Sequence, residues 1–488
     1  LDIVNGPLMA GMDEVGRLFN ANELIVAEVL QSAEAMKAAV AHLEPHMDSA
    51  SVQERGTVLL ATVKGDVHDI GKNLVDIILT NNGYRVVNLG IKIPPETLIQ
   101  AHDEHAPHII GLSGLLVKSA QQMVTTAEDL AARGVNTPVL VGGAALSAKF
   151  TATRIAPAYT TGGVAYARDA MDGLRLANAL MAGEDVAAAP NDPVTHVSPR
   201  EQAPLAAPTV TRRSSRVPAL SDAPAPPNYG RHVVEGDADE LFEWVSPQLL
   251  YGRGLGFRGN FAKAFDAGDR KALDLERSVR EVRARAAEES WLSPRAVYQF
   301  YECEASGNEI SVVARDGSGS SEQFAFPRQS TEDGLCLADY VAEAGSGVLD
   351  SLCMFVTTAG GTVRESAEIL KDRGEYVASH TLSALAYELA EAFAERLHGQ
   401  IRAMWGFADP ANITRRQLAR GEYRGKRYSF GYPACPDMQD HDGMWRLLRP
   451  DGIGVDLTES HMMDPEASVS ALVFHHPDAQ YFDTKARA

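Results

Sequence analysis

The stretch TVLLATVKGDVHDIGKN, residues 57–73, joins an apolar run to a short polar loop and predicts the fold around it. The apolar run has the unbroken hydrophobic character of a strand that is buried on both faces of a parallel sheet. The loop places His68 between Asp66 and Asp69 and follows it with Gly71. Ligands of open parallel sheets bind where a strand ends and the next helix begins, so this loop is the first candidate site.

The same strand-like pattern recurs on the C-terminal side of the loop. Helix-length segments separate four more short apolar runs, which are YRVVNLG, HIIGLSG, PVLVGG and GVAYA. Strands that alternate with helices form a parallel sheet with both faces covered. We therefore predict a doubly wound, flavodoxin- or Rossmann-like α/β domain over residues 51–185.

The rest of the chain divides into three further parts, as expected for 488 residues. Residues 1–50 carry apolar side chains at helical spacing and predict a small helical bundle. Residues 186–230 hold nine of the 25 prolines and no hydrophobic period, which predicts an extended, semi-rigid linker. Residues 231–488 combine strand-like segments such as EISVVARD with a long amphipathic helix, which predicts a separate α+β domain.

Composition excludes several classes of function. The formal net charge is −20, so phosphate backbones and anionic membranes would repel the bulk of the chain, and we expect neither nucleic acid nor membrane as a partner. The sequence has no apolar run of about 18 residues and no signal-peptide layout at its start, so we expect a cytoplasmic location. Its four cysteines are too far apart for a disulfide framework or a zinc motif. Because the chain begins with Leu1 inside a helical pattern, we expect a fragment of a longer protein or a subunit.

A single histidine beside carboxylates suits a metal that brings most of its ligands with it. One ring nitrogen of His68 would bind the metal while the other donates to Asp66 or Asp69. A zinc or iron ion held by protein alone needs three or four protein ligands. A corrinoid ring supplies four nitrogens and leaves axial positions on its cobalt. The alternative, for an isolated loop histidine, is a solvated or capping residue.

Two further elements at fixed spacing extend the loop into a longer pattern. After DVHDIG at 66–71 come 41 residues, then Ser113-x-Leu115, then 26 residues, then Gly142-Gly143. This pattern resembles the signature of cobalamin-binding domains in which a protein histidine displaces the nucleotide base of the cofactor. In that family the displaced nucleotide tail lies in a channel of the sheet, lined by small residues at strand ends.

The resemblance implies roles for individual residues. His68 would be the axial ligand of cobalt, and Asp66 with Ser119 would take up the proton change, so these three are the predicted catalytic group. The residues implied to contact cobalamin are Gly65, Asp66, Val67, His68, Asp69, Gly71, Ser113, Gly114, Leu115, Val117, Ser119, Gly142, Gly143 and Ala170.

Residues 1–50 resemble the cap bundle that precedes the corrinoid domain in methionine synthase and in related corrinoid proteins. By this resemblance Phe19 and Val26 would cover the methyl group on cobalt, with valine where leucine is expected. The alternative is that both side chains are ordinary bundle core.

The loop RGKRYSFGYPACPDM, residues 424–438, mixes arginine, aromatics, glycine and proline. Arg427 could bind a carboxylate through two hydrogen bonds, and a surface turn is the alternative. The loop resembles the S-adenosylmethionine loop of the methionine synthase activation domain, as do LAEAFAERLH, LTESHMMDPEASVSALVF and HPDAQYF. Glu243 stands where that family has aspartate for the amino group of the ligand. The residues implied to bind S-adenosylmethionine are Glu243, Arg427, Gly431, Tyr432, Ala434, Tyr481 and Phe482.

The resemblance covers nearly the whole chain in the order of the cobalamin-dependent methionine synthase family: cap, cobalamin domain, linker and activation domain. It implies a methyltransferase of methionine and amino-acid biosynthesis. Methyltetrahydrofolate would methylate cob(I)alamin, methylcobalamin would methylate homocysteine, and S-adenosylmethionine with a flavodoxin-type reductase would reactivate cob(II)alamin. The homocysteine and folate modules would lie in an N-terminal half or a separate subunit. The alternatives are a corrinoid methyl carrier for another acceptor and a non-enzymatic cobalamin sensor.

Overall fold

The computed structural model describes residues 3–43, 55–184, 186 and 212–484, and groups the chain into two compact units. Unit 1 takes in residues 1–201, 247–286 and 364–385, and unit 2 takes in residues 202–246, 287–363 and 386–488. Two helical segments of the predicted C-terminal domain therefore group with unit 1. Within the described ranges, no helix combines the length and the apolar character needed to cross a membrane.

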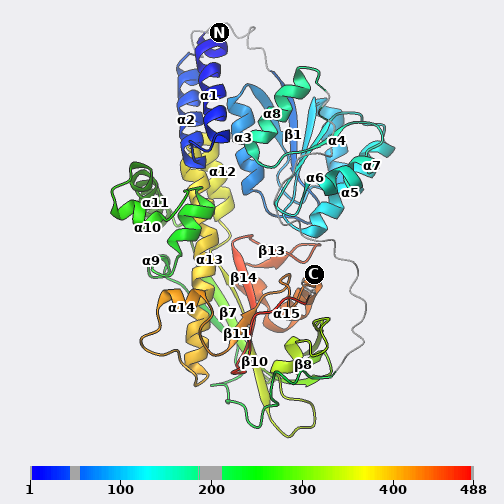
Figure 1. Ribbon diagram of the computed structural model, residues 1–488, viewed down its shortest axis with the longest axis vertical. Helices are drawn as coiled ribbons and strands as arrows, with labels where there is room; N and C mark the ends of the chain where they lie inside the picture. Colours follow the sequence, from blue (N-terminus) through cyan, green and yellow to red (C-terminus); the bar gives the residue numbers. More distant parts are fainter. Residues whose placement is uncertain (1–2, 44–54, 185, 187–211, 485–488) are drawn as a thin grey trace. The chain divides into compact units, whose positions relative to one another are not determined.

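Unit 1 contains the predicted doubly wound sheet (Figure 1). Its five strands are all parallel, in the order β2-β1-β3-β4-β5, which is the flavodoxin-like order. The strands are β1 (Gly56–Thr62), β2 (Tyr84–Asn88), β3 (Ile109–Ser113), β4 (Val139–Gly142) and β5 (Val164–Tyr166). The prediction of a parallel α/β domain is confirmed.

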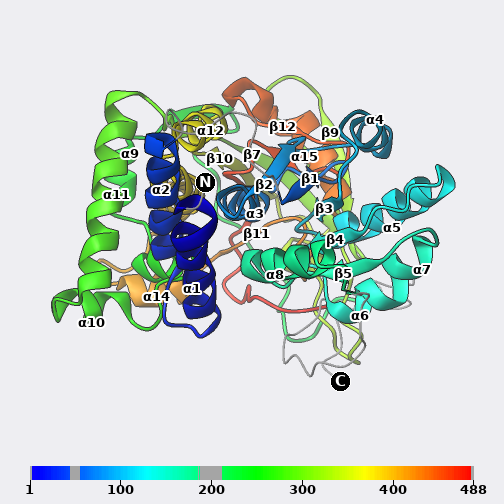
Figure 2. The same ribbon diagram turned by 90° about the horizontal axis from the view of Figure 1, so that it is seen from above.

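Helices cover both faces of this sheet (Figure 2). Leu59 and Ala61 of β1 belong to the apolar cluster under α4 and α5, while Val58 and Leu60 belong to the cluster under α3 and α8. Because successive strand residues point to opposite faces, this double burial explains the unbroken apolar run. The helices are α3 (Ile70–Asn81), α4 (Pro95–His105), α5 (Val117–Ala132), α6 (Ala148–Phe150), α7 (Ala156–Ala158) and α8 (Ala170–Met181), with a π-helical turn at Thr151–Ile155.

The remaining helices of unit 1 include the predicted N-terminal bundle. A π-helical turn at Val4–Leu8 leads into α1 (Met9–Asn20), and α2 (Val26–Leu43) follows. Leu30 and Ala33 of α2 pack with Ile77 of α3 and with Tyr376. The other helical segments are the π-helical turn Gln248–Gly254, α10 (Phe261–Asp266), α11 (Arg270–Glu288), α12 (Val363–Arg373) and the first turns of α13 (Tyr376–Met404).

Unit 2 is built on an antiparallel seven-stranded sheet, as expected for the α+β domain. The strand order is β11-β14-β10-β7-β8-β9, and β6 pairs with β7. These strands are β6 (His232–Glu235), β7 (Arg295–Ser306), β8 (Glu309–Val313), β9 (Ser321–Ala325), β10 (Asp350–Thr358), β11 (Lys426–Tyr428) and β14 (Ser468–Phe474). The other elements are α9 (Ala238–Phe242), α14 (Arg415–Ala419), α15 (His441–Leu448), the small pair β12 (Asp456–Leu457) and β13 (Met463–Asp464), the C-terminal part of α13, and single 3₁₀ turns at Leu337–Tyr340, Met438–Asp440 and Pro450–Ile453.

The second part of the predicted linker differs from the prediction. Residues 187–211 lie outside the described residues, but residues 212–230 belong to unit 2. Val217 is 2% exposed within the core of that unit, and the indole N–H of Trp405 donates to the carbonyl of Pro224 at 3.0 Å. The packing is physically reasonable because proline carbonyls accept hydrogen bonds although proline lacks an N–H.

Candidate functional site

The loop between β1 and α3 holds His68 through one carboxylate. Nδ1 of His68 lies 2.7 Å from Oδ1 of Asp66, and the backbone N–H of His68 donates to the same oxygen at 2.9 Å. Of the two carboxylates that flank His68, Asp66 is therefore the hydrogen-bond partner of the ring. Asp69 lies directly before the first residue of α3. A ring that donates from Nδ1 to a carboxylate keeps its lone pair on Nε2.

The second oxygen of Asp66 is bound from another element. The hydroxyl of Ser119, in the first turn of α5, donates to Oδ2 at 2.5 Å, and the N–H of Leu115 donates at 2.7 Å. Burial raises the pKa of Asp66, but the hydrogen bonds from His68 and Ser119 outweigh burial and leave the pKa below its ordinary value. Asp66 is thus a buried carboxylate that stays ionised and orients His68.

Glycines bring the neighbouring strand ends close to this relay. A Cβ atom on Gly143, whose φ is +139°, would lie 1.7 Å from the carbonyl oxygen of Gly114. A Cβ atom on Gly114 would lie 2.6 Å from Cβ of Ser119. At Gly71, by contrast, an added Cβ would meet no atom within 4 Å. Gly114 and Gly143 therefore allow close packing of the loops after β3 and β4, whereas Gly71 faces open space.

The other predicted cobalamin residues lie along the same edge of the sheet or on the helices that begin there. Ser113 and Gly142 end β3 and β4 and pair in register, and Val117 and Ala170 begin α5 and α8. Leu115 is 37% exposed. The loop residues Gly65, Val67 and Asp69 are buried.

The two predicted cap residues pack within unit 1. Phe19 packs against the apolar cluster under α3 and α8, and Val26 packs against the cluster of Leu30, Ile77 and Tyr376. Their placement over a methyl group stays a prediction.

The donor set fits a cofactor that supplies most of its own ligands. The His68 side chain is 24% exposed and offers one ring nitrogen after pairing with Asp66. No group of three or more His, Cys, Asp or Glu side chains in the described residues is arranged to hold a metal ion. A corrinoid cobalt, which needs one axial nitrogen from the protein, matches this arrangement better than a zinc or iron ion bound by protein alone.

The second predicted site is centred on Arg427 in β11, at the edge of the unit 2 sheet. Its Nη2 lies 3.4 Å from Oε2 of Glu391 and 3.4 Å from Oε2 of Glu395, both on α13. Burial lowers the pKa of Arg427, but the two glutamates outweigh burial and raise it. Arg427 is therefore a permanently charged group on a mostly buried side chain, which is 18% exposed.

The loop after β11 closes on itself. The N–H of Gly431 donates to the carbonyl of Cys435 at 2.9 Å, and the N–H of Cys435 donates to the carbonyl of Tyr432 at 3.0 Å. Gly431 has a φ of +91°, a left-handed conformation that favours glycine. Ala434 is buried, whereas Tyr432 is 63% exposed. The loop thus presents an aromatic side chain outward from a rigid turn.

The remaining predicted residues lie on other segments of unit 2. Tyr481 is half exposed, packs edge-on against Tyr428 of β11, and its hydroxyl lies 3.4 Å from the hydroxyl of Tyr423. Phe482 is partly buried in the core of unit 2. Glu243 is exposed at the end of α9. α9 is tied to α13 by the ion pair of Glu240 with Arg396, at 2.6 Å.

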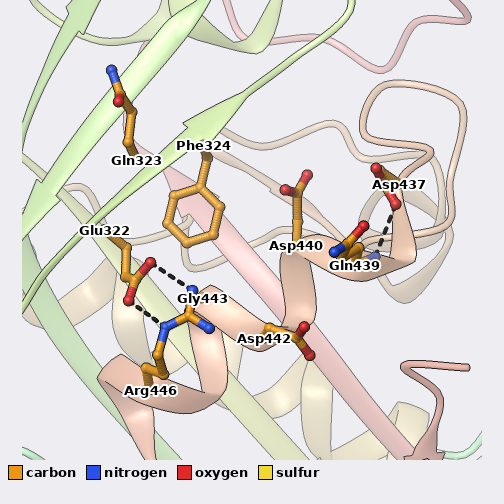
Figure 3. A pocket seen from close by; sticks show the side chains of 9 residues that line it. All are labelled: Glu322, Gln323, Phe324, Asp437, Gln439, Asp440, Asp442, Gly443 and Arg446. Carbon is orange, nitrogen blue, oxygen red and sulfur yellow. Dashed lines mark hydrogen bonds and ion pairs between the residues drawn. The ribbon is translucent and has the colours of Figure 1, made fainter. Parts of the chain in front are cut away.

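A cavity of about 290 Å³ lies beyond this loop (Figure 3). Four of its nine lining residues are acidic, and Arg446 pairs with Glu322 at 2.5 and 2.8 Å across one side. Burial, with a contribution from Asp437, raises the pKa of Asp440 to about 7. None of the predicted site residues lines this cavity, whose residues are Glu322, Gln323, Phe324, Asp437, Gln439, Asp440, Asp442, Gly443 and Arg446.

Comparison with known families agrees with this geometry. Residues 56–175 and residues 1–44 match two families that are each described as a B12 binding domain. Residues 254–486 match the family described as "Vitamin B12 dependent methionine synthase, activation domain". Over 99% of its length the chain is 37% identical to methionine synthase of Mycobacterium tuberculosis and 36% identical to that of Mycobacterium leprae. The chain belongs to the cobalamin-dependent methionine synthase family.

The chain spans 44% of the length of each of these two relatives of the family. A solved structure, "Crystal Structure of the MetH Reactivation Domain bound to AdoHcy", is 30% identical, with a TM-score of 0.50. That likeness covers 54% of this chain and 83% of the other. His68, Ser119, Arg427 and Tyr481 all lie within matched ranges, whereas Glu243 precedes the range of the activation domain.

Sequence reasoning missed four polar residues around Arg427. Glu391, Glu395 and His398 share one side of α13, and Tyr423 lies on the segment before β11. Their spacing of four and three residues on a helix that contains the family-like segment LAEAFAERLH is the signal that would have pointed to them.

Proposed function

We propose that this chain is the cobalamin-carrying and reactivation portion of methionine synthase, a cobalamin-dependent methyltransferase. In the complete system a methyl group passes from methyltetrahydrofolate, through the bound cobalamin, to homocysteine. The observation that carries this proposal is the relay of Ser119, Asp66 and His68, which leaves Nε2 of His68 as the ring nitrogen that would bind the metal of a cofactor. The match of the surrounding sheet to a B12 binding domain supports it.

When bound, cobalamin supplies the cobalt that accepts and releases the methyl group. His68 would hold the cobalt through Nε2, and Gly65, Gly71 and the strand-end residues Ser113 to Leu115 would line the corrin and its nucleotide tail. Asp66 fixes the tautomer of His68 and stabilises positive charge on the ring. When His68 is not bound to the metal, its Nε2 can take a proton, and the hydrogen bond from Ser119 keeps Asp66 ionised beside it.

The site around Arg427 would bind S-adenosylmethionine, the methyl donor for reactivation. The guanidinium would bind the carboxylate of the ligand and Glu243 its ammonium, while Tyr481 and Phe482 contact the adenosyl part. The backbone of Gly431, Tyr432 and Ala434 would line the rest of the ligand. The solved reactivation domain with AdoHcy, 30% identical to this chain, supports this assignment.

The complete reaction needs partners beyond this chain. Homocysteine- and methyltetrahydrofolate-binding modules would lie in the N-terminal half of a longer protein or in a separate subunit. A flavodoxin-type reductase would supply the electron for reactivation, and we propose a cytoplasmic location. We also propose domain boundaries of 1–50 for the cap, 51–185 for the cobalamin domain, 186–230 for the linker and 231–488 for the activation domain.

The proposal is tested by the absorbance spectrum of the chain after methylcobalamin is added and the excess removed. The parent should retain about one cofactor per chain with a histidine-ligated spectrum, and His68→Gln should give a base-off spectrum. His105→Gln, on α4, is the matched control and should behave like the parent. A parent chain that retains no cofactor would refute the proposal.

A further inference from the structure

The contacts of Arg427 are incomplete on one edge of its guanidinium. Nη2 faces Glu391 and Glu395, each at 3.4 Å, which is longer than the 2.7–2.9 Å of a strong charge-assisted bond. Nη1 of Arg427 and Oε1 of Glu395 are buried, and neither has a hydrogen-bond partner among the described residues. Buried polar atoms of native proteins nearly always have a partner, either protein or water. The glutamates alone therefore do not account for how Arg427 is held.

His398, one helical turn after Glu395, also has buried polar atoms without a hydrogen-bond partner in the described residues. Its side chain is fully buried, and within the described chain neither ring nitrogen has a hydrogen-bond partner. The ring packs edge-on against Tyr423, with the centroids 5.3 Å apart. A phenylalanine ring would make a similar contact without burying two unpaired nitrogens, which is unfavourable. Histidine at this position therefore indicates a polar role.

The charges around His398 define that role. Burial and then the nearby cations Arg402, Arg427 and Lys426 lower the pKa of His398 well below its ordinary value. The ring is therefore neutral, and one of its nitrogens carries a lone pair. Residues three apart on a helix lie on the same side, so Glu395 and His398 both face the strand that carries Arg427.

Unpartnered atoms thus occur on three neighbouring side chains of the described residues: a donor on Arg427 and acceptors on Glu395 and His398. A buried water commonly makes about three hydrogen bonds to such groups. We propose that His398 is a positioning residue for Arg427, acting through a bridging water that it shares with Glu395. The water accepts from Nη1 of Arg427 and donates to His398 and Glu395, and the guanidinium plane is thereby fixed toward the carboxylate of the ligand. This inference rests on the proposed function, because that function assigns Arg427 to S-adenosylmethionine.

The proposal predicts a selective loss of affinity for ligands that carry an amino-acid carboxylate. Isothermal titration calorimetry of the full chain should compare S-adenosylhomocysteine with 5′-methylthioadenosine, which lacks the carboxylate. His398→Phe should lower the affinity for S-adenosylhomocysteine about tenfold and change the affinity for methylthioadenosine by less than about twofold. His398→Gln, which keeps an acceptor, should recover most of the loss. In a double-mutant cycle with Arg427→Met, the effects on S-adenosylhomocysteine should be strongly non-additive.

The control is His441→Phe, on α15. His441 is also buried and neutral, but Nδ1 and Nε2 have partners in the carbonyl of His461 and the hydroxyl of Ser470. Its substitution should change the two affinities by the same factor. If His398→Phe does not fold, Glu395→Gln replaces it and should show the same selectivity.

The outcomes separate this inference from the proposed function. A parent chain that binds S-adenosylhomocysteine, combined with unchanged affinity in a folded His398→Phe, would overturn the positioning role alone. An equal loss for both ligands would also overturn it, because that result indicates a general packing role. A parent chain that binds neither ligand would overturn the proposed function and this inference together.

Discussion

The histidine loop of unit 1 and the arginine site of unit 2 are held in different ways. Both oxygens of Asp66 accept hydrogen bonds, from His68, Ser119 and Leu115, at 2.5–2.9 Å. Arg427 has two contacts of 3.4 Å and a buried Nη1 without a partner in the described residues. A complete network fixes a side chain before its ligand arrives, whereas an incomplete one is finished by water or ligand. The comparison indicates that His68 is oriented by protein groups alone, whereas the orientation of Arg427 is completed by water or ligand.

The largest expected effect comes from removing the charge at the arginine site. Arg427→Met should lower the affinity for S-adenosylhomocysteine by about a hundredfold or more, because the substitution removes the charged partner of the ligand's carboxylate. Calorimetry measures the loss. The control is Arg415→Met, because the guanidinium of Arg415 stacks on Trp244. Equal affinities of Arg427→Met and the parent would remove Arg427 from the site.

The second-largest expected effect comes from changing Asp66, whose two oxygens both accept hydrogen bonds. Asp66→Asn should lower the affinity for cobalamin about 10- to 100-fold and reduce the fraction of cofactor that is bound by histidine. The reason is that a neutral amide does not stabilise positive charge on the His68 ring. Asp69→Asn is the matched change on the other side of His68, and it should have a much smaller effect. Absorbance titration with methylcobalamin compares the two. Equal effects would contradict the assignment of Asp66 as the partner.

A buried lysine beside the histidine loop gives a pH-dependent test. Lys72 is 4% exposed, and its Nζ donates to the side-chain oxygens of Asn73 and Asn88, each at 2.7 Å. Burial lowers the pKa of Lys72 to about 8. The unfolded chain, with a pKa near 10.4, binds more protons between these values, so stability should rise with pH from about 8 to about 10.

The size of this effect is about 2 kcal/mol, since one pKa unit is worth about 1.4 kcal/mol. It is measured as the pH dependence of the unfolding midpoint of the parent relative to Lys72→Met, which lacks the titrating group. The gap between the two should shift in favour of the parent as the pH rises. A gap that is constant over this range would show that Lys72 has an ordinary pKa.

The smallest effect is expected at the rim of the arginine site. The hydroxyls of Tyr481 and Tyr423 are 3.4 Å apart, and Tyr481 is half exposed, so their hydrogen bond is weak. Tyr481→Phe should change the affinity for S-adenosylhomocysteine by less than about twofold, whereas Tyr481→Ala should reduce it by about fivefold through loss of the ring. Similar losses for both variants would mean that the hydroxyl matters more than the ring.

Sequence reasoning reached the histidine loop because topology determines its surroundings. Residues at the carboxyl ends of parallel strands meet at one edge, so His68, Ser113 and Gly142 were expected together. The residues alone left Asp66 and Asp69 both open as the partner of His68, because both flank it. The resemblance implied Asp66, which is the residue that pairs with His68 in the structure.

The surroundings of Arg427 were harder to predict for a physical reason. Glu391, Glu395 and His398 read as the polar side of an amphipathic helix, which is usually solvated. The pairing of Arg427 with Val473 places the arginine at the edge strand of the sheet, where α13 supplies its partners. That register is a long-range property that no local pattern encodes. The packing of residues 212–230 within unit 2 was not predicted, because a proline-rich composition indicates an extended linker and does not show which carbonyls, such as that of Pro224, accept hydrogen bonds.

The most direct test of the central claim identifies the axial atom on cobalt. The chain should be labelled with ¹⁵N-histidine, loaded with cobalamin, reduced to the cobalt(II) state and measured by electron paramagnetic resonance. If His68 is the ligand, the nitrogen splitting should change from the triplet of ¹⁴N to the doublet of ¹⁵N, and His68→Gln should abolish the doublet. A triplet that persists in the labelled parent would show that the cofactor's own base remains on cobalt and would contradict the account.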